Sequence, residues 1–302
     1  MAILIDTATT TLIQGMTGKE GQKVLGWMQQ TGSRVAAGVT PGKGGQQVAG
    51  VPVYNSVPEA LDRHPEINLS SVYVPPRFVA SAVDEALAAG IKTVHIISEG
   101  VPTRDTVSLL EKADRLQARL IGPSSVGVAS PGQYYLGSMG GGNPSQYLPP
   151  SHDGGGVAVL SKSGGMANTI ATMLTAAGVP QTTVVGIGGD RIVGTSFADL
   201  LGDLATDHHT RAVVVIGEIG GAYEEVLAEE MVAQNFAKPV VAFISGLFAE
   251  TLPQGASFGH AGAIVSRQEG SRDSKMKALR QAGATVVESP SQIIERLTNL
   301  DQ

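Results

Sequence analysis

Short apolar runs alternate along the chain with segments in which apolar residues recur every three or four positions. The runs predict buried β-strands and the periodic segments predict amphipathic helices. In the first half, strands are predicted at 11–14, 33–39, 70–75, 92–97 and 119–122, and helices at 22–30, 77–89 and 106–118. In the second half, strands are predicted at 157–160, 182–187, 212–216, 238–244 and 285–287, and helices at 166–177, 271–282 and 291–297. This alternation indicates an α/β protein with two doubly wound parallel sheets, whose ligands bind at the carboxyl ends of the strands.

The two halves are separated by a segment of different composition. Residues 131–155 are rich in Gly, Pro, Ser and Tyr and show no periodicity, which predicts a connection between domains. We therefore expect one domain at 1–130 and a second at 156–302. The length of 302 residues suits two domains of roughly 150 residues each.

Composition narrows the class of protein. The formal net charge of −6 argues against a nucleic-acid binder, which is usually basic. There is no cysteine, so disulfides, a thiolate nucleophile and zinc-thiolate sites are excluded. No apolar run approaches the roughly 20 residues that a membrane span needs, and the first residues do not resemble a signal peptide. We expect a soluble cytoplasmic protein that binds neither nucleic acid nor membrane.

A glycine-rich turn joins the first predicted strand to the first predicted helix. It reads Gly15-Met-Thr-Gly-Lys-Glu-Gly21. Glycines let backbone N–H groups approach an anion, and a helix N-terminus adds partial positive charge. The spacing differs from the Gly-x-Gly-x-x-Gly signature of dinucleotide sites, and the usual acidic residue after the second strand is missing. The turn predicts a phosphate-binding loop of another kind.

A lysine lies on the loop after the second strand, in Thr40-Pro-Gly-Lys43-Gly-Gly45. Lys43 supplies positive charge where an NAD enzyme would carry its ribose-binding carboxylate. A nucleotide with an extra phosphate, such as NADP or coenzyme A, is therefore expected. The alternative is that Lys43 is solvated in a flexible loop.

The second half contains another strand, polar turn and helix start. Ser163, Gly164 and Gly165 open the helix at 166–177 and offer backbone amides and a hydroxyl to an anion. Glu218 follows a strand and is flanked by glycines, so it could reach a histidine on a neighbouring loop. A carboxylate bound to one ring nitrogen selects the tautomer of an imidazole and supports charge on the other nitrogen.

One histidine is set among small residues, in Phe258-Gly-His260-Ala-Gly262. With no bulky neighbour, the imidazole can present a ring nitrogen to a reactive group, and it exchanges charge readily near neutral pH. The alternative is that His260 merely occupies a turn. His95 lies inside a predicted strand, and we expect it to be buried and structural.

Seven motifs, in order and over nearly the whole chain, are very similar to those of the α subunits of NDP-forming acid–CoA ligases, whose type member is succinyl-CoA synthetase. The motifs are Gly15 to Gly21, Thr40-Pro-Gly-Lys-Gly-Gly45, Val72-Tyr73-Val-Pro75, Ser98-Glu-Gly100, Gly186-Ile-Gly-Gly-Asp190, Ile216-Gly-Glu-Ile-Gly-Gly221 and Gly259-His-Ala-Gly-Ala-Ile264. The resemblance implies a Rossmann-like CoA-binding domain followed by a flavodoxin-like ligase domain.

The resemblance also implies roles for particular residues. The implied CoA-binding residues are Thr17, Gly18, Lys19, Glu20, Lys43, Tyr73, Ser98 and Glu99. His260 would be transiently phosphorylated with Glu218 as its partner, while the helix start at Ser163, Gly164 and Gly165 holds the phosphate. No metal ligands are expected in this chain. ATP or GTP with Mg²⁺ would be bound mainly by a partner β subunit with an ATP-grasp fold, in an αβ or (αβ)₂ assembly.

The sequence motifs indicate the reaction more clearly than they indicate the acid substrate. Succinate-specific members usually read Ser-Gly-Thr followed soon by Tyr, whereas this chain reads Ser163-Gly-Gly165-Met-Ala-Asn168. That run and Phe258 before Gly-His-Ala-Gly look more like ATP-citrate lyase and citryl-CoA synthetase. Gly165 and Asn168 would make room for, and hydrogen-bond to, a bulkier hydroxylated acid. Succinate and citrate, or another hydroxy-carboxylate, both stay open.

Two other functions are compatible with these residues. The chain could be a CoA-binding regulatory protein that keeps the fold without turnover. It could also be an NADP oxidoreductase, on the grounds of the glycine loop and Lys43. Binding and substrate assays separate both from an acid–CoA ligase subunit.

Overall fold

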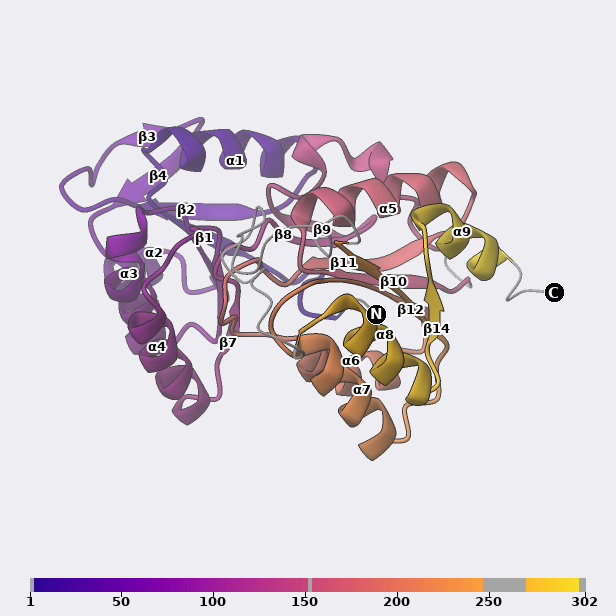
Figure 1. Ribbon diagram of the computed structural model, residues 1–302. Helices are drawn as coiled ribbons and strands as arrows, with labels where there is room; N and C mark the ends of the chain where they lie inside the picture. Colours follow the sequence, from indigo (N-terminus) through magenta and orange to yellow (C-terminus); the bar gives the residue numbers. More distant parts are fainter. Residues whose placement is uncertain (1–2, 152–153, 247–269, 299–302) are drawn as a thin grey trace.

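The computed structural model describes residues 3–151, 154–246 and 270–298, and these form two α/β units side by side (Figure 1). Each unit is built on a sheet that has seven strands within the described residues. Most strands in both sheets are parallel, and helices cover both faces of each sheet. The predicted α/β class with two doubly wound sheets is confirmed.

The first sheet has the order β3-β4-β2-β1-β5-β6-β7. Its strands are β1 (Thr11–Gln14), β2 (Val35–Val39), β3 (Gln47–Val48), β4 (Val51–Tyr54), β5 (Leu69–Val72), β6 (Thr93–Ile96) and β7 (Arg119–Ile121). All adjacent pairs are parallel except β3 with β4. Without β3, the order is that of a Rossmann fold, and the direction of winding reverses between β1 and β5.

Helices on the two faces of the first sheet bury different apolar stripes. The helix α1 (Lys19–Gln30) packs Val24, Leu25 and Met28 on one face. The helices α2 (Val57–Arg63), α3 (Pro76–Ala88) and α4 (Thr103–Arg115) pack on the other. Apolar residues at i, i+3 and i+4, such as Val79, Val83, Ala86 and Leu87 in α3, produce these stripes.

The second sheet has the order β14-β13-β12-β10-β11-β8-β9. Its strands are β8 (Gly127–Ser130), β9 (Tyr134–Gly137), β10 (Gly156–Ser161), β11 (Gln181–Gly186), β12 (Thr210–Glu218), β13 (Val240–Ser245) and β14 (Thr285–Val287). The five parallel strands follow the flavodoxin order, which reverses its winding between β10 and β12.

Helices α5 (Gly164–Ala176) and α9 (Pro290–Thr298) cover one face of the second sheet. Helices α6 (Leu201–Thr206), α7 (Tyr223–Ala233) and α8 (Arg272–Gln281) cover the other (Figure 1). Three short 3₁₀ turns complete the described structure: η1 (Met139–Gly142), η2 (Pro144–Gln146) and η3 (Ala198–Leu200). Among the described residues, no helix is both long and apolar enough to cross a membrane.

The structure differs from the sequence interpretation around residue 130. Strands β8 and β9, which fall at the end of the expected first domain and inside the expected connection, extend the second sheet in antiparallel fashion. Gly127, Gly132 and Gly137 all adopt positive φ here. These glycines interrupt the alternation of apolar and polar residues by which a strand is recognised. The expected bounds 1–130 and 156–302 stay a prediction.

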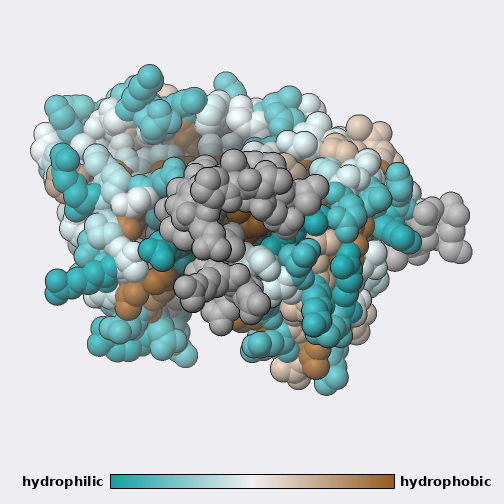
Figure 2. Space-filling view, viewed as in Figure 1, coloured by the Kyte–Doolittle hydropathy of each residue, from teal (hydrophilic) through white to brown (hydrophobic). Residues whose placement is uncertain are grey.

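The two sheets share one core. The largest cluster of buried apolar side chains contains Ile13 and Leu25 from the first unit together with Leu160 and Val215 from the second. A hydrogen bond also connects the two units: the Tyr134 hydroxyl donates to the Arg34 carbonyl oxygen at 2.6 Å. On the face in Figure 2, hydrophilic residues (teal) make up much of the described surface, and apolar residues (brown) occupy smaller areas.

Candidate functional site

A cavity of about 700 Å³ lies at the carboxyl ends of β1, β2 and β5. Neighbouring connections leave β1 and β5 in opposite directions, which opens a crevice at this point of the sheet. Thr17, Gly18, Thr40 and Tyr73 are among the residues that line it. The apolar side chains of Val39, Val74, Phe78 and Ala82 contribute to its wall. The cavity lies where the sequence predicts a nucleotide-binding loop.

Gly15 and Gly21 are required by the geometry of the turn. Gly15 has a φ of +83°, and a Cβ there would approach the Tyr73 carbonyl oxygen to 2.5 Å. A Cβ on Gly21 would lie 2.5 Å from the Gly15 carbonyl oxygen. The chain then enters α1 at Lys19, where Gly18 is the N-cap and has no side chain to bond the first amides. Those amides are therefore available to an anion.

The cavity unites some of the predicted cofactor-binding residues and not others. Thr17, Gly18 and Tyr73 are among its lining residues. Lys19, Glu20, Lys43, Ser98 and Glu99 are not part of the described lining, so their roles stay predictions.

Two of the predicted residues outside the lining, Lys43 and Ser98, lie on loops that hydrogen bonds hold in place. Lys43 is exposed on a loop in which the Gly42 and Gly44 amides both donate to Asn55 Oδ1 at 3.0 Å. Ser98 Oγ donates to the Val74 carbonyl oxygen at 2.5 Å, which connects the loop after β6 to the cavity wall. The Gly100 amide donates to Asp190 Oδ1 at 3.3 Å and so links the same loop to the segment that follows β11.

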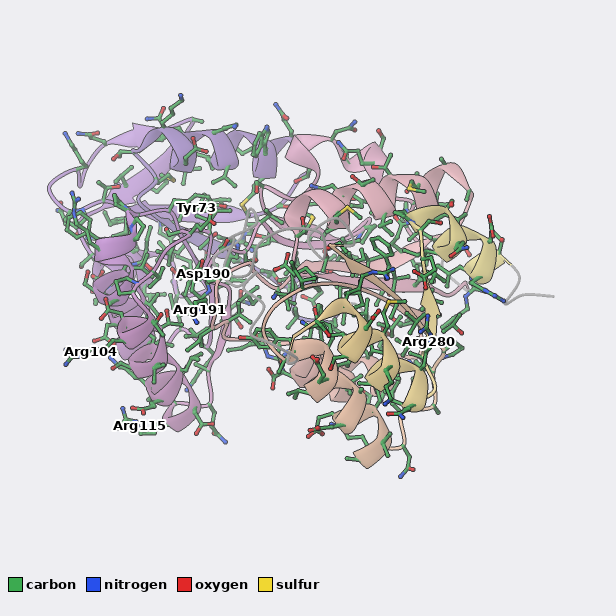
Figure 3. The ribbon with its side chains drawn as sticks, in the orientation of Figure 1. Tyr73, Arg104, Arg115, Asp190, Arg191 and Arg280 are labelled. Carbon is green, nitrogen blue, oxygen red and sulfur yellow. The ribbon has the colours of Figure 1, made fainter. Side chains whose placement is uncertain are left out.

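A buried histidine lies behind the cavity. The ring of Tyr73 (labelled in Figure 3) meets the ring of His95 edge-on, with centroids 6.3 Å apart. His95 is fully buried; its Nε2 lies 3.0 Å from the Ser125 carbonyl oxygen and its Nδ1 lies 2.8 Å from Ser71 Oγ. A carbonyl only accepts, so Nε2 carries the proton and Nδ1 accepts from the serine. The expectation that His95 is buried and structural is confirmed.

Burial also sets the proton affinities of these two rings. Loss of solvent raises the pKa of the Tyr73 hydroxyl above its usual range. Loss of solvent lowers the pKa of His95 to about 4, although the hydrogen bond with the Ser125 carbonyl acts in the opposite direction. His95 is thus neutral at physiological pH.

The lowered pKa of His95 predicts an acid-sensitive contribution to stability. Its folded-state pKa of about 4 lies below the ordinary 6.5, so the unfolded chain takes up this proton first as pH falls. The contribution is complete above pH 6.5 and is lost by about 1.4 kcal/mol per pH unit down to the folded pKa. Urea denaturation at several pH values measures the free energy of unfolding. Between pH 6.5 and 4, this free energy should fall less steeply with decreasing pH in His95→Gln than in the wild type. Equal slopes would contradict the assignment, and other titrating groups cancel in the comparison.

The second site lies where the winding of the second sheet reverses. Ser161 ends β10, and Lys162 and Ser163 follow it; Glu218 ends the adjacent strand β12. Lys162 Nζ lies 3.1 Å from Glu218 Oε1, and these side chains are only 1% and 9% exposed. The Tyr223 ring centroid is 5.4 Å from the same ammonium. The sequence interpretation assigned no role to Lys162, although a lysine between two serines at the end of a strand is the signal that was available.

The main chain at Glu218 is held by a second buried ion pair. The Glu218 amide donates to Glu224 Oε1 at 3.1 Å, and the other oxygen of Glu224 contacts Lys275 Nζ. Both Glu224 and Lys275 are completely buried. Lys275 Nζ also donates to the Gly220 carbonyl oxygen at 2.7 Å. The turn that carries Glu218 is therefore attached to α7 and α8.

The start of α5 has the shape of an anion site. Ser163 is the N-cap, and its Oγ accepts from the Met166 amide at 3.4 Å. The amides of Gly164 and Gly165 belong to the helix end, where N–H groups have no partner inside the helix. A Cβ on Gly164 would lie 2.2 Å from Val126 Cγ1, whereas Gly165 is exposed. Glycine at 164 is thus imposed by packing.

Asn168 lies one turn further along α5 and is already oriented. Its Oδ1 accepts from the Tyr147 hydroxyl and from the Gly140 amide, the latter at 3.3 Å. Because both bonds use the oxygen, the amide nitrogen is the part of Asn168 left for another acceptor. Its predicted role in binding the acid stays a prediction.

His260 lies outside the described residues, so its distance from Glu218 and Ser163 is not part of the described geometry. Within the described residues, no group of three or more His, Cys, Asp or Glu side chains could hold a metal ion.

The fold, together with the families that its two units match, defines a CoA-binding α/β protein with a ligase-type second unit. Residues 6–100 match the family described as CoA binding domain, and residues 160–287 match the family described as CoA-ligase. These matches contain the cavity at Gly15 and Tyr73 and the ion pair at Lys162 and Glu218.

Similar proteins identify the family more closely. A succinate–CoA ligase [ADP-forming] subunit alpha 2 from Archaeoglobus fulgidus is 44% identical over 99% of this chain and 100% of its own length. A subunit of an ADP-forming sulfoacetate–CoA ligase from an Acholeplasma species is 38% identical over 99% of this chain and 98% of its own. The chain belongs to the family of α subunits of NDP-forming acid–CoA ligases, and it is an enzyme subunit of that class. The predicted membership and reaction class are confirmed.

A solved structure with the same architecture belongs to a longer polypeptide. ATP citrate lyase from Methanosaeta concilii, in complex with (3S)-citryl-CoA, superposes with a TM-score of 0.88 and 25% identity. The match covers 99% of this chain, which spans about half the length of that polypeptide, 51%.

Proposed function

We propose that this chain, together with a nucleotide-binding β subunit, joins a carboxylic acid to CoA through a phosphohistidine at position 260. The phosphoryl group of NTP passes to His260, and the carboxylate of the acid then takes it to give an acyl phosphate. The CoA thiol displaces inorganic phosphate from the acyl carbon and forms the thioester. Each step is reversible, so the same residues can also cleave an acyl-CoA.

The observation that supports this proposal best is a repeated arrangement. In each of two sheets that share a core, a strand ends in a glycine turn at the point where the winding reverses, and a helix begins there. The first turn borders a cavity of about 700 Å³ that suits a nucleotide-like ligand. The second joins Lys162, which forms an ion pair with the buried carboxylate of Glu218, to the amides at the start of α5. Such amides are suited to phosphoryl oxygens.

Glu218 suits the role of partner to a phosphorylated imidazole. A carboxylate that accepts from one ring N–H orients the imidazole and stabilises charge on it. Ser163, Gly164 and Gly165 would hold the phosphoryl group at the start of α5. Thr17, Gly18 and Tyr73 would contact CoA in the cavity, with Lys19, Glu20, Lys43, Ser98 and Glu99 around it.

The acid is a di- or tricarboxylate of succinate type in this proposal, with citrate or another hydroxy-carboxylate as the alternative. The named relatives act on succinate and on sulfoacetate, and the superposable structure is an ATP citrate lyase. Asn168 Oδ1 accepts from Tyr147, and its amide nitrogen has no acceptor among the described residues, which favours an acid with an additional acceptor. A panel of succinate, malate and citrate with the reconstituted complex distinguishes these acids.

The partner in this proposal is a β subunit of ATP-grasp fold that binds ATP or GTP with Mg²⁺, in an αβ or (αβ)₂ assembly. The Archaeoglobus relative is itself called an alpha subunit, and it matches this chain from end to end. If the isolated chain binds CoA and does not bind a nicotinamide nucleotide, the result would agree with the proposal.

Labelling of the complex tests the proposal directly. With γ-labelled ATP or GTP, the α chain should acquire an acid-labile, base-stable label that CoA and the correct acid remove. His260→Asn should abolish both the label and turnover. His208→Asn is the matched control, since His208 lies in an exposed turn beside β12 and should leave labelling unchanged. A label that persists in His260→Asn would overturn the proposal.

A further inference from the structure

The cavity of the first unit has two kinds of lining. At the start of α1 it is lined by Thr17 and Gly18, where backbone amides suit phosphate oxygens. At the ends of β2 and β5 and along α3 it is lined by apolar side chains, which are those of Val39, Pro41, Val74, Pro75, Phe78 and Ala82. A nucleotide with its phosphates at α1 therefore places its base against α3.

An exposed aromatic ring belongs to the apolar part of this lining. Phe78 is 48% exposed, although most large apolar side chains of the described residues are buried. Bases stack on aromatic rings, and a base that covers Phe78 removes this apolar surface from water. The ring favours a flat aromatic ligand at the α3 end of the cavity.

A carboxylate lies at the same end. Glu85, on the third turn of α3, is half-buried and lines the cavity. Its Oε1 accepts from the Val57 amide at 2.9 Å, which holds the side chain against the start of α2. Its Oε2 has no hydrogen-bond partner among the described residues and is not sealed from solvent. One oxygen is therefore held in place while the other is free to accept from a ligand.

The neighbouring polar side chains of the lining already have partners. Gln14 Nε2 donates to the Ala82 carbonyl oxygen at 3.0 Å, and its Oε1 accepts from a serine of β5 at 2.8 Å. Ser81 Oγ donates to the Phe78 carbonyl oxygen at 2.9 Å. Among the described lining residues, Glu85 is the only one with a charged side chain. It is thus the strongest acceptor that this end of the cavity offers.

We propose that Glu85 recognises the adenine of CoA through its 6-amino group. The amino group donates to Glu85 Oε2, and the base lies against the apolar side chains at the ends of β2 and β5 and along α3. An ionised carboxylate can only accept, so it selects an amino group at this position over a carbonyl oxygen. This inference rests on the part of the proposed function that places CoA in the cavity.

Calorimetric titration of the full chain tests the inference with two ligands. One is CoA, and the other is its deaminated analogue, in which hypoxanthine replaces adenine and the phosphates and pantetheine arm are unchanged. The wild type should bind CoA at least fivefold more tightly than the analogue, because in the analogue a carbonyl oxygen would face the carboxylate. A smaller preference would overturn the inference.

The variant Glu85→Gln should change which base is preferred. Its amide oxygen can still accept from the Val57 amide, so the start of α2 keeps its contact, while its NH₂ group donates toward the base. The dissociation constant for CoA should rise at least fivefold, and the variant should bind the analogue at least as tightly as CoA. If both ligands weaken by the same factor, Glu85 acts through the position of α2 and the inference is wrong. If the variant does not fold, the preference of the wild type decides.

Asp84→Asn is the matched control for the loss of charge. Asp84 precedes Glu85 in α3, but its side chain is 55% exposed, pairs with Lys112 at 2.7 Å and is not part of the described lining. Both dissociation constants should stay within twofold of wild type in this variant. A change of base preference as large as that in Glu85→Gln would assign the effect to net charge and would contradict the inference.

The outcomes separate base recognition from the proposed function. If CoA binds without the preference and the complex is labelled on His260, only the role of Glu85 fails. If the preference is found but His260 is never labelled, the phosphohistidine fails and base recognition stands. If neither ligand binds to the chain or to the reconstituted complex, the CoA site of the proposed function fails and this inference fails with it.

Discussion

Replacing Lys275 with methionine is expected to lower the free energy of unfolding by about 3–5 kcal/mol, because it leaves a buried carboxylate without its cation. Lys275 and Glu224 are both fully buried, and Lys275 also donates to the Gly220 carbonyl. The substitution keeps most of the side-chain volume, so the loss measures the missing charge and hydrogen bonds more than a cavity. Urea denaturation followed by circular dichroism at neutral pH gives the value.

Two further variants show that the Lys275 effect comes from burial. Lys112 pairs with Asp84 at 2.7 Å, but these side chains are 29% and 55% exposed. Lys112→Met should therefore change stability by less than about 1 kcal/mol. The double variant Lys275→Met, Glu224→Gln should recover much of the loss, since it leaves no uncompensated charge. Equal losses in Lys275→Met and Lys112→Met would contradict the prediction.

Replacing Gly15 with alanine is expected to weaken CoA binding at least tenfold, which corresponds to about 1.4 kcal/mol. Gly15 adopts a φ of +83°, and a Cβ would lie 2.5 Å from the Tyr73 carbonyl oxygen. A left-handed backbone costs a residue with a side chain about 1–2 kcal/mol. The contact adds to this cost unless the two loops separate. Because both loops line the cavity, their separation changes the shape of the site.

Calorimetric titration of the α chain with CoA measures the effect of Gly15→Ala, and Gly26→Ala supplies the control. Gly26 lies within α1, its φ is not in the left-handed region, and a Cβ there would meet nothing within 4 Å. Alanine should therefore leave CoA affinity unchanged and stabilise the helix by up to about 1 kcal/mol. Unaltered CoA affinity in Gly15→Ala would show that the turn tolerates a side chain and that the cavity is shaped by other residues.

Most of the described fold could be anticipated from local patterns. The strand at 11–14 and the helices at 77–89 and 166–177 lie within a few residues of β1, α3 and α5. The elements β4, α2, α6 and α7 have no predicted counterpart. Strands β8 and β9 were also missed, since they are short, begin at or after glycines with positive φ, and pair antiparallel, β8 with β11 and β9 with β8. Their stability depends on the neighbouring strand and not on a strong pattern of their own.

The candidate site was anticipated in part. The turns at 15–21 and 163–165 were recognisable because strand, glycine and helix are consecutive in the chain. The hydrogen-bond partners of Asn168 could not be recognised from the sequence, since Tyr147 and Gly140 lie in a segment that lacks periodicity. Lys162 was missed for a related reason: a lysine at the end of a strand is usually solvated, and only the packing of Tyr223 and Glu218 around it shows that it is buried.

The sequence by itself determined the alternation of strands and helices, the two glycine turns and the family. These depend on residues adjacent in the chain, whose backbone preferences and apolar spacing act locally. The tertiary structure alone decided that Tyr73 lies against Gly15 at the cavity and that Lys162 meets Glu218. These residues are far apart in sequence, and they come together because parallel strands bring their carboxyl ends to one edge, where the order of the sheet chooses the neighbours.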